Sequence, residues 1–164
     1  MATAFKNLSS YDIATLPSAV NYRFGIVISE WNPEITEALY KGAYITLLKT
    51  GATENNIISK LVPGSFELPL GAQFMIEYLK VDCVICLGCI IQGETRHFEF
   101  ICQTVAAGIS QLNLTYNVPV IFGILTTDNY QQAKERAGGK HGNKGVEAAV
   151  AGIKMVTLKK EMQE

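Results

Sequence analysis

The feature that most constrains the fold of this chain is a regular alternation of short apolar runs with longer segments of helical periodicity. The apolar runs predict strands at 22–30, 56–64, 81–91 and 118–127. The periodic segments predict helices at 33–51, 66–80, 97–117, 129–138 and 145–162, the last two joined by the glycine-rich turn GGKHGN. Such alternation predicts an α/β fold with three layers, in which helices cover both faces of a four-stranded parallel sheet. Right-handed crossovers restrict the winding to a flavodoxin-like or a Rossmann-like order.

The helical segments carry boundary signals as well as periodicity. Pro33 suits the first turn of the helix at 33–51, and Gly51 suits its end. The residues expected on the buried face of this helix are Ile35, Leu39, Ala43, Thr46 and Leu47. In the next helix, Pro69 is tolerated only in the first turn.

The length and composition suit a single domain over residues 1–164. Of the 164 residues, 48% are hydrophobic and 18% are charged, which is enough for a proper core at 22–162. Residues 1–21 have no clear period, and we predict an N-terminal arm that orders only against another surface, such as a neighbouring subunit. The net charge of −1 gives no indication of binding to nucleic acid or to a membrane surface.

The cysteines and the first residues bear on the compartment. Cys83, Cys86 and Cys89 lie on the strand predicted at 81–91, where cysteine usually acts as a small hydrophobe. Because residues three apart on a strand face opposite sides, Cys86 is expected to point away from the other two, and we predict no metal site. We predict a reducing compartment, the cytoplasm, since the start of the chain lacks the apolar run of a signal peptide. No apolar run approaches the roughly 18 residues of a membrane-spanning helix.

Polar and aromatic residues collect at the carboxyl ends of the predicted strands. The four strands end in SEWN, VPGSFE, IIQGETRH and LTTD. Ligands of parallel α/β sheets bind beyond the carboxyl ends of the strands. The sequence therefore predicts a binding site at this edge of the sheet.

The segment from Gly93 to His97 leads from a buried strand into a helix. Backbone N–H groups at a helix start favour an anion, Gly93 allows a tight turn, and Thr95 can cap the helix. Glu94 would repel a phosphate if its side chain pointed inward, so only its backbone is expected to help. A plain capped helix start explains the same residues equally well.

His97 and Trp31 each allow two interpretations. A histidine titrates near neutral pH and can pass protons in either direction, but a lone histidine is also common as a structural or solvated residue. Trp31, the only tryptophan, stands beside Asn32 at the end of the first strand. It could stack on a flat ring or roof the core.

Arg136 and Lys144 flank the glycine-rich turn. An arginine holds phosphate with two parallel N–H groups and a lysine supplies a mobile charge, although both residues are more often solvated at helix ends. His141, within the turn, is expected on the surface. The turn is not a P-loop, because it lacks the required order of glycines and lysine and follows a helix. The residues alone thus predict an α/β domain with a site for an anion and a ring.

Four segments resemble, in order and with matching spacing, the signature segments of the lumazine synthase family: PGSFELP, GETRHFEF, VPVIFGILTTD and ERAGGKHGNKG. The resemblance runs from about residue 22 to residue 162 and implies the flavodoxin-like form of the fold. It implies a transferase that condenses 5-amino-6-(D-ribitylamino)uracil with 3,4-dihydroxy-2-butanone 4-phosphate. The products are 6,7-dimethyl-8-ribityllumazine, phosphate and water, in the penultimate step of riboflavin biosynthesis. The family needs neither cofactor nor metal.

The resemblance also implies roles for individual residues. Trp31, beside Asn32, matches the aromatic that stacks on the pyrimidine, and His97 matches the catalytic histidine that transfers protons. Further residues match the pyrimidine and ribityl site: Ser65, Phe66, Glu67, Cys89, Ile90, Ile91 and, reaching in from a neighbouring subunit, Phe122. The phosphate site is matched by the backbone of Glu94 and Thr95 and by Arg136, with Lys144 and Glu147 as supporting polar groups.

Two positions depart from the family pattern. Gln92 stands where many members carry arginine, and Arg96 stands where proline or a small residue is frequent. Neither departure removes one of the roles above. Arg96 adds a positive charge beside the predicted phosphate site, and this charge could either tighten phosphate binding or slow its release.

The resemblance further implies an assembly. Family members form pentamers with active sites between subunits, and many pack twelve pentamers into an icosahedral shell of 60 subunits. Purely pentameric members tend to carry insertions near the turn before the last helix. The segment AGGKHGNKG is short, so we predict the shell, in which the N-terminal arm adds a strand to a neighbour's sheet. Riboflavin synthase is a candidate partner, enclosed by the shell.

Two other functions compete with the synthase. A related flavin-pathway protein, such as the archaeal-type riboflavin synthase, shares the architecture, but the intact PGSFE, His97 and ERAG argue against it. A non-catalytic lumazine or flavin binder, or a pure shell protein, could keep the pocket without turnover. Loss of His97 or Arg136 would have supported that alternative, and both residues are present.

Overall fold

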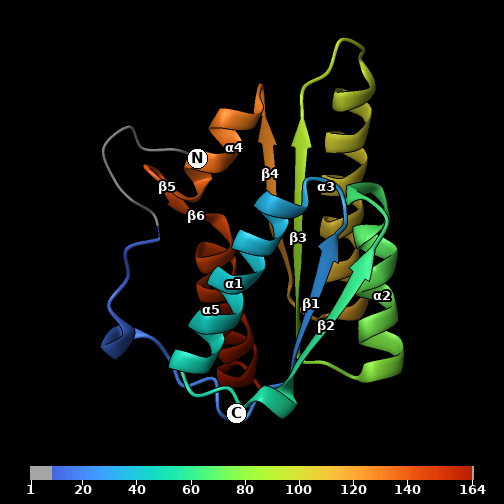
Figure 1. Ribbon diagram of the computed structural model, residues 1–164. Coiled ribbons are helices and arrows are strands. Elements are labelled where there is room, and N and C mark those ends of the chain that lie inside the picture. The colour runs from blue at the N-terminus through green and yellow to red at the C-terminus, as the bar shows by residue number, and fades with distance from the viewer. Residues whose placement is uncertain (1–8, 164) are drawn as a thin grey trace.

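The protein is built on one sheet of four parallel strands, described here from a computed structural model that covers residues 9–163. The strands are β1 (Phe24–Ser29), β2 (Ile57–Val62), β3 (Cys83–Ile91) and β4 (Val120–Thr127). They are arranged in the order β2-β1-β3-β4, and all three neighbouring pairs are parallel (Figure 1). This order is the flavodoxin-like one, so the predicted fold class is confirmed.

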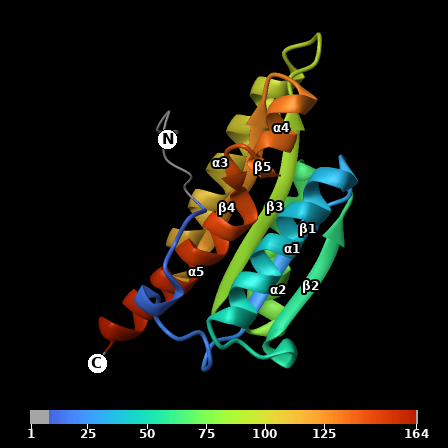
Figure 2. The ribbon, with the colours of Figure 1, turned by 60° about the vertical axis from the view of Figure 1, so that its left-hand side comes forward.

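Helices cover both faces of the sheet and complete the three layers. Figure 2 shows α1 (Pro33–Lys49) and α5 (Lys144–Glu161) side by side on one face, and α2 (Leu68–Leu79) and α3 (His97–Tyr116) lie on the other. Each face has its own apolar core. Cys83 and Cys89 pack in the core under α1 and α5, and Cys86 packs in the core under α2 and α3. The predicted alternation of these thiols along β3 is therefore confirmed.

The boundaries of α1 and α2 follow the signals in the sequence. Pro33 is the first residue of α1, and the helix ends just before Gly51, whose φ of 103° lies in the region that only glycine adopts without strain. All the residues predicted on its inner face are buried: Ile35, Leu39, Ala43, Thr46 and Leu47. The helix α2 follows a short 3₁₀ turn, η3 (Ser65–Glu67), and Pro69 lies in its first turn as expected.

The helices α1 and α5 approach each other closely at the start of α5. A Cβ atom on Gly145 would lie 1.9 Å from the backbone oxygen of Leu39, so only glycine fits at this crossing. The side chain of Asn143 caps α5 by accepting from the N–H groups of Gly145 and Val146, and its amide also donates to the backbone oxygen of Ala38 at 2.9 Å. The start of α5 is thereby fixed to the middle of α1.

The glycine-rich segment predicted as a plain turn is a short hairpin. After α4 (Tyr130–Arg136), the chain forms β5 (Ala137–Gly139) and β6 (Gly142–Asn143), which pair antiparallel. Gly138 and Gly142 have φ values of 117° and 82°, which explains why the segment needs glycine at these positions. The prediction of helix up to residue 138 was therefore two residues too long.

The described part of the N-terminal arm lies against its own chain. Residues 9–21 contain one 3₁₀ turn, η1 (Ile13–Thr15), and the Tyr11 hydroxyl donates to Oγ1 of Thr46 on α1 at 3.2 Å. The backbone N–H of Asn143 donates to the hydroxyl of Ser9 at 2.9 Å. The surface that these residues contact is thus one of their own chain. The predicted addition of an N-terminal strand to a neighbour's sheet also involves residues 1–8, which lie outside the described residues.

None of the helices described for residues 9–163 combines the length and the apolarity that crossing a membrane requires.

Candidate functional site

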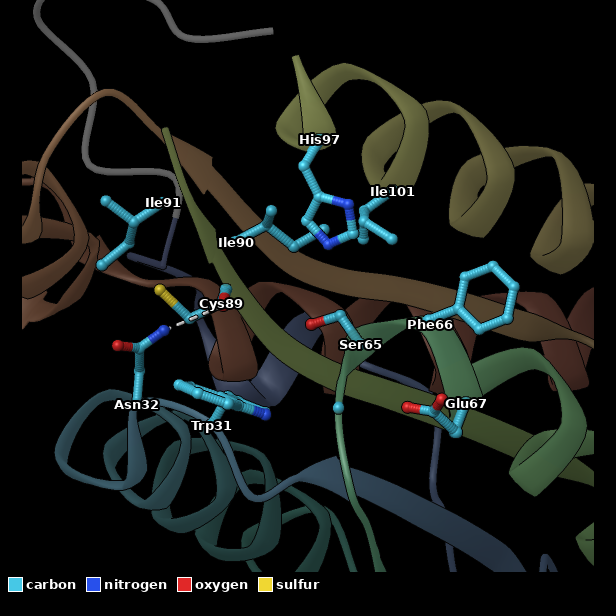
Figure 3. Close-up of a pocket in the computed structure, with 11 residues that line it drawn as sticks. Trp31, Asn32, Ser65, Phe66, Glu67, Cys89, Ile90, Ile91, His97 and Ile101 are labelled. Carbon is cyan, nitrogen blue, oxygen red and sulfur yellow. Dashed lines mark hydrogen bonds between the residues drawn. The ribbon is translucent and has the colours of Figure 1, made fainter. Parts of the chain in front are cut away.

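A cavity of about 490 Å³ lies at the carboxyl ends of β1 and β3, between η3 and the start of α3 (Figure 3). It occupies the edge of the sheet where the sequence placed the site. Every residue predicted for the pyrimidine and ribityl chain except Phe122 lines it, together with the catalytic candidate. The lining residues are Trp31, Asn32, Gly64, Ser65, Phe66, Glu67, Cys89, Ile90, Ile91, His97 and Ile101.

Trp31 stands at the rim of the cavity and does not roof the core. Its side chain is 71% exposed, and Figure 3 shows its ring between Asn32 and the segment of Ser65. A tryptophan is costly to leave in water without a partner, because its large apolar surface stays hydrated. Of the two interpretations of Trp31, the structure therefore supports the ring that can stack on a ligand.

Asn32 makes the sharp bend between β1 and α1. Its φ and ψ of 58° and 56° are left-handed, a conformation that asparagine tolerates better than most residues. Its side-chain amide donates to the backbone oxygen of Cys89 at 3.1 Å, the dashed line in Figure 3. Asn32 thus ties the Trp31 bend to the end of β3.

The strand β3 extends past its neighbour β1, so a backbone edge without a strand partner lies at the cavity. Pairing between β1 and β3 ends at Ile28 and Leu87, whereas pairing of β3 with β4 continues to Ile91 and Thr127. On the β1 side, the final residues of β3 therefore have no strand partner. A flat ligand with several N–H and C=O groups can bond to such an edge as a short strand would.

The turn η3 supplies the wall opposite β3. Ser65 is buried, Glu67 is half-buried, and the ring of Phe66 is exposed. A Cβ atom on Gly64 would lie 3.2 Å from a carboxylate oxygen of Glu67 and 3.4 Å from the Trp31 ring. Gly64 therefore lets these two side chains share the cavity mouth. It was not among the predicted site residues, although PGS in the sequence was the available signal.

His97 is the first residue of α3, and its ring points into the cavity beside Ile101 (Figure 3). Ile101 was also missed, although a residue four positions after His97 lies on the same helix face. The N-cap is Arg96 instead of Thr95, whose hydroxyl accepts from the backbone N–H of His97 at 3.4 Å. The Thr95 contact is thus a weak form of the predicted cap.

The loop before α3 presents unpaired backbone donors. Within residues 9–163, no acceptor of the chain bonds to the N–H groups of Gly93, Glu94, Thr95 or Arg96. The Glu94 side chain is exposed and does not line the cavity. Arg96 is well exposed and pairs with Glu99 at 3.3 Å. Free N–H groups at a helix start suit an anion.

Cys89 is buried at the back of the cavity beside Asn32. Burial raises the pKa of its thiol to about 11, so the thiol stays protonated at neutral pH. A protonated thiol is neither a nucleophile nor a metal ligand. Cys89 therefore contributes shape and its backbone to the site.

Besides Glu94 and Thr95, four of the predicted residues do not line the cavity of their own chain. Phe122 lies in the middle of β4, at the edge of the sheet, where with Ile109 and Asn113 it lines a separate depression of about 360 Å³. Arg136 is the half-buried last residue of α4. Lys144 and Glu147 form an ion pair of 3.0 Å in the first turn of α5.

Comparison with known proteins gives a consistent result. The family model described as 6,7-dimethyl-8-ribityllumazine synthase matches residues 21–160. A 6,7-dimethyl-8-ribityllumazine synthase of Cytophaga hutchinsonii is 60% identical over 156 residues, which cover 95% of this chain and 98% of the relative. Proteins of the same description from Flavobacterium psychrophilum and Parabacteroides distasonis are 56% and 54% identical, over 98% and 96% of this chain and 85% and 99% of their own lengths.

Proposed function

The chain belongs to the 6,7-dimethyl-8-ribityllumazine synthase family and has this synthase activity in riboflavin biosynthesis, and we propose that the reaction takes place in the cavity at the ends of β1 and β3. The substrates proposed are 5-amino-6-(D-ribitylamino)uracil and 3,4-dihydroxy-2-butanone 4-phosphate, the pair that the family condenses. One observation carries the proposal. Trp31, Glu67 and His97 are distant in sequence, yet all three line the same cavity.

The pyrimidine ring is proposed to lie between Trp31 and the end of β3. The exposed indole offers a flat face for stacking. The backbone edge at the end of β3 has no strand partner on the β1 side, although the oxygen of Cys89 is bonded to Asn32, and its remaining N–H and C=O groups match the polar edge of a uracil. Glu67, on the opposite wall, would accept hydrogen bonds from the hydroxyl groups of the ribityl chain.

The phosphate of the second substrate is proposed to bind at the start of α3. Its oxygens would accept from the unpaired N–H groups between Gly93 and Arg96. Arg136 would then neutralise the charge of the departing phosphate. Because Arg136 lies outside the cavity of its own chain, we propose that a neighbouring subunit supplies it. Phe122, on the open edge of β4, would reach a neighbour's cavity in the same way.

His97 is proposed as the group that moves protons. The amine of the pyrimidine attacks the ketone of the second substrate, water leaves, phosphate is expelled and the second ring closes. Each of these steps transfers a proton to or from nitrogen, carbon or oxygen, and an imidazole serves in both directions. His97 lies on the wall of the cavity where the two proposed subsites meet. Holding both substrates in one cavity would supply a further large part of the acceleration.

The assembly and the compartment are proposed on separate grounds. Apolar side chains remain exposed along one face of α2, namely Leu70, Phe74 and Tyr78, and they suit burial against other subunits. We propose a pentamer, packed further into a 60-subunit shell. We propose the cytoplasm as the compartment, since all four cysteines are free thiols.

The placement of the pyrimidine can be tested with the only tryptophan of the chain as the probe. The pyrimidine alone is titrated into the protein, and calorimetry measures its binding while the emission of Trp31 is followed. Stacking should quench this emission along the same saturation curve. Saturable binding that leaves the emission unchanged would contradict the proposed position of the ring.

A matched variant completes the test. Trp31→Phe should keep turnover, because phenylalanine also stacks, but should lose the emission signal. Turnover is followed as lumazine absorbance against a protein-free control, since the reaction has an uncatalysed background. Loss of turnover to the background rate in Trp31→Phe would show that the indole does more than stack.

A further inference from the structure

Three side chains near the bend at Asn32, none of which lines the cavity, form an ionic cluster that the proposed function leaves unused. The phenol of Tyr130 donates a hydrogen bond to one carboxylate oxygen of Glu34, and the ammonium of Lys134 lies 3.1 Å from the other. The same ammonium lies 5.4 Å from the centre of the Tyr130 ring. We call Glu34, Tyr130 and Lys134 the clasp. It joins the first turn of α1 to α4, across 96 residues of sequence.

One end of the clasp is next to the bend that carries Trp31. Glu34 follows Asn32 by two residues, and Asn32 is left-handed at this point. A left-handed conformation is unfavourable for a non-glycine residue, so the bend needs bonds on either side to persist. Those bonds are Glu30 N–H to the oxygen of Val62 at 2.9 Å and the Asn32 amide to Cys89. The clasp is the third restraint, on the helix side of the bend.

The other end of the clasp is a rigid support. In α4, Ala133 is completely buried in the core. Asn129 caps the same helix by accepting from the N–H of Gln132 at 3.0 Å. Tyr130 and Lys134 are one turn apart on this helix, so one carboxylate meets both. The clasp therefore fastens the bend to an element that is itself held by the core.

The protonation states agree with this geometry. The hydrogen bond from Tyr130 and then the bond and charge of Lys134 lower the pKa of Glu34. The bond to Glu34 is also the main cause that raises the pKa of Tyr130, followed by burial and the charge of Glu34, with a further contribution from Cys89. Glu34 is thus a charged acceptor and Tyr130 a protonated donor at neutral pH.

We propose that the clasp of Glu34, Tyr130 and Lys134 is a positioning device that holds Trp31 at the rim of the cavity and thereby sets the affinity for the pyrimidine substrate. The inference rests on the proposed stacking role of Trp31. The three residues touch neither substrate in this arrangement. They act through the bend, and their loss should weaken pyrimidine binding more than phosphate binding.

The test uses Tyr130→Phe, which keeps the ring but removes the donor, and Glu34→Gln, which removes the charge. The matched control is Glu37→Gln, the same change on an exposed residue of the same helix. Both clasp variants should lower the anisotropy of Trp31 emission in the ligand-free protein, because the bend gains freedom. They should raise KM for the pyrimidine about three- to tenfold, the worth of one net hydrogen bond, and KM for the butanone phosphate less than about twofold. The control should match the unmodified protein.

Combining the two changes sharpens the result. Because one bond joins the two residues, the double variant should have little more effect than either single one. Unchanged anisotropy and unchanged KM in both variants would overturn the proposal. Equal rises in both KM values together with a lower melting temperature would also overturn the proposal. A general loss of structure, and not a loss of Trp31 positioning, would then explain the effect.

A separate variant distinguishes failure of the clasp from failure of the proposed site. Trp31→Ala should raise KM for the pyrimidine if the indole stacks on it. If Trp31→Ala raises KM for the pyrimidine and the clasp variants do not, the proposed role of the clasp is wrong and the proposed pyrimidine site is supported. If Trp31→Ala has no effect, the proposed site is wrong, and the inference drawn from it falls as well.

Discussion

At the scale of single residues, His97 is the imidazole that the structure places in the cavity. Cys89, at the back of the same cavity, keeps its proton because burial raises the pKa of the thiol to about 11. We expect His97→Ala to slow turnover by roughly 10-fold or more, because the variant loses the group proposed to transfer protons. The measurement is kcat from lumazine absorbance, with the uncatalysed rate subtracted.

The other histidine of the chain serves as the control for this prediction. His141 lies on the hairpin, exposed, and its ring is 3.6 Å from the carboxylate of Glu135. It does not line the cavity. His141→Ala should leave kcat within about twofold. Equal rates for His97→Ala and the unmodified protein would leave His97 with a structural role only.

Arg136 is proposed to bind the phosphate of the second substrate, so its replacement should affect mainly that substrate. A guanidinium that binds phosphate contributes to one substrate and not to the other. Arg136→Ala should therefore raise KM for the butanone phosphate far more than KM for the pyrimidine. Lys140→Ala removes an equal charge from the exposed end of the same hairpin and should change neither. Steady-state kinetics with each substrate varied in turn measures the two KM values. Equal effects of Arg136→Ala on both values would contradict its proposed role in phosphate binding.

The residues of the site differ in how far sequence alone could place them. Trp31 and His97 follow directly from the ends of β1 and β3, because a parallel sheet brings all carboxyl ends of its strands to one edge. The left-handed bend at Asn32 and the clasp could not be predicted, since they depend on side-chain contacts between α1 and α4. Arg136 could be predicted as a residue type, but the sequence does not show that it lies outside the cavity of its own chain.

At the scale of elements, the start of α5 depends on one side chain. Asn143 caps α5 and also donates to Ala38 on α1, so it serves two helices. Asn143→Ala should lower the free energy of unfolding by about 1–2 kcal/mol, the sum of a lost cap and a lost side-chain hydrogen bond to α1. Urea unfolding at a fixed protein concentration measures this loss, because the stability of an oligomer depends on concentration.

The cap of α4 gives the comparison for α5. Asn129 accepts from the N–H of Gln132 at 3.0 Å and is exposed. Asn129→Ala should cost about 0.5–1 kcal/mol, since water replaces the lost acceptor. If the two variants are destabilised equally, the bond from Asn143 to α1 contributes nothing measurable.

The elements themselves show which local signals were sufficient. The apolar stripe of α1, with Pro33 at its start and Gly51 at its end, gave the helix nearly residue by residue. The hairpin of β5 and β6 was missed because its strands are two and three residues long and rich in glycine, so they have no apolar period. The surface on which residues 9–21 pack could not be predicted for a related reason. Its contacts are single hydrogen bonds between residues far apart in sequence.

At the scale of the whole molecule, the alternation of strands and helices determined the architecture. A long apolar run on both faces identified β3 as a central strand, and it lies between β1 and β4. The edges of the sheet are β2 and β4. Open sheet edges are commonly covered by other chains, which agrees with the proposed position of Phe122 at a neighbour's cavity.

The assembly is the prediction that belongs to the molecule as a whole. The single chain leaves large apolar side chains in water, among them Tyr78 at 71% and Leu114 at 81% exposure. It also leaves Arg136 and Phe122 away from its own cavity, so a lone subunit would lack two of the proposed site residues. A stable oligomer would bury the exposed apolar side chains and would bring Arg136 and Phe122 to the cavity of a neighbouring subunit. With subunits of 17.9 kDa, a pentamer has about 90 kDa and a 60-subunit shell about 1,070 kDa.

Analytical ultracentrifugation separates these assemblies. We expect the large species, because AGGKHGNKG folds as a tight hairpin of five residues in two strands without an insertion. A species near 90 kDa would overturn the shell and keep the proposed exchange of Arg136 and Phe122 between subunits. A monomer with full turnover would overturn that exchange, since each cavity would then work without a neighbour. Mixing two impaired variants, Arg136→Ala and His97→Ala, gives an independent check. If a neighbour supplies the arginine, mixed oligomers contain some cavities with both residues intact, and part of the activity should return.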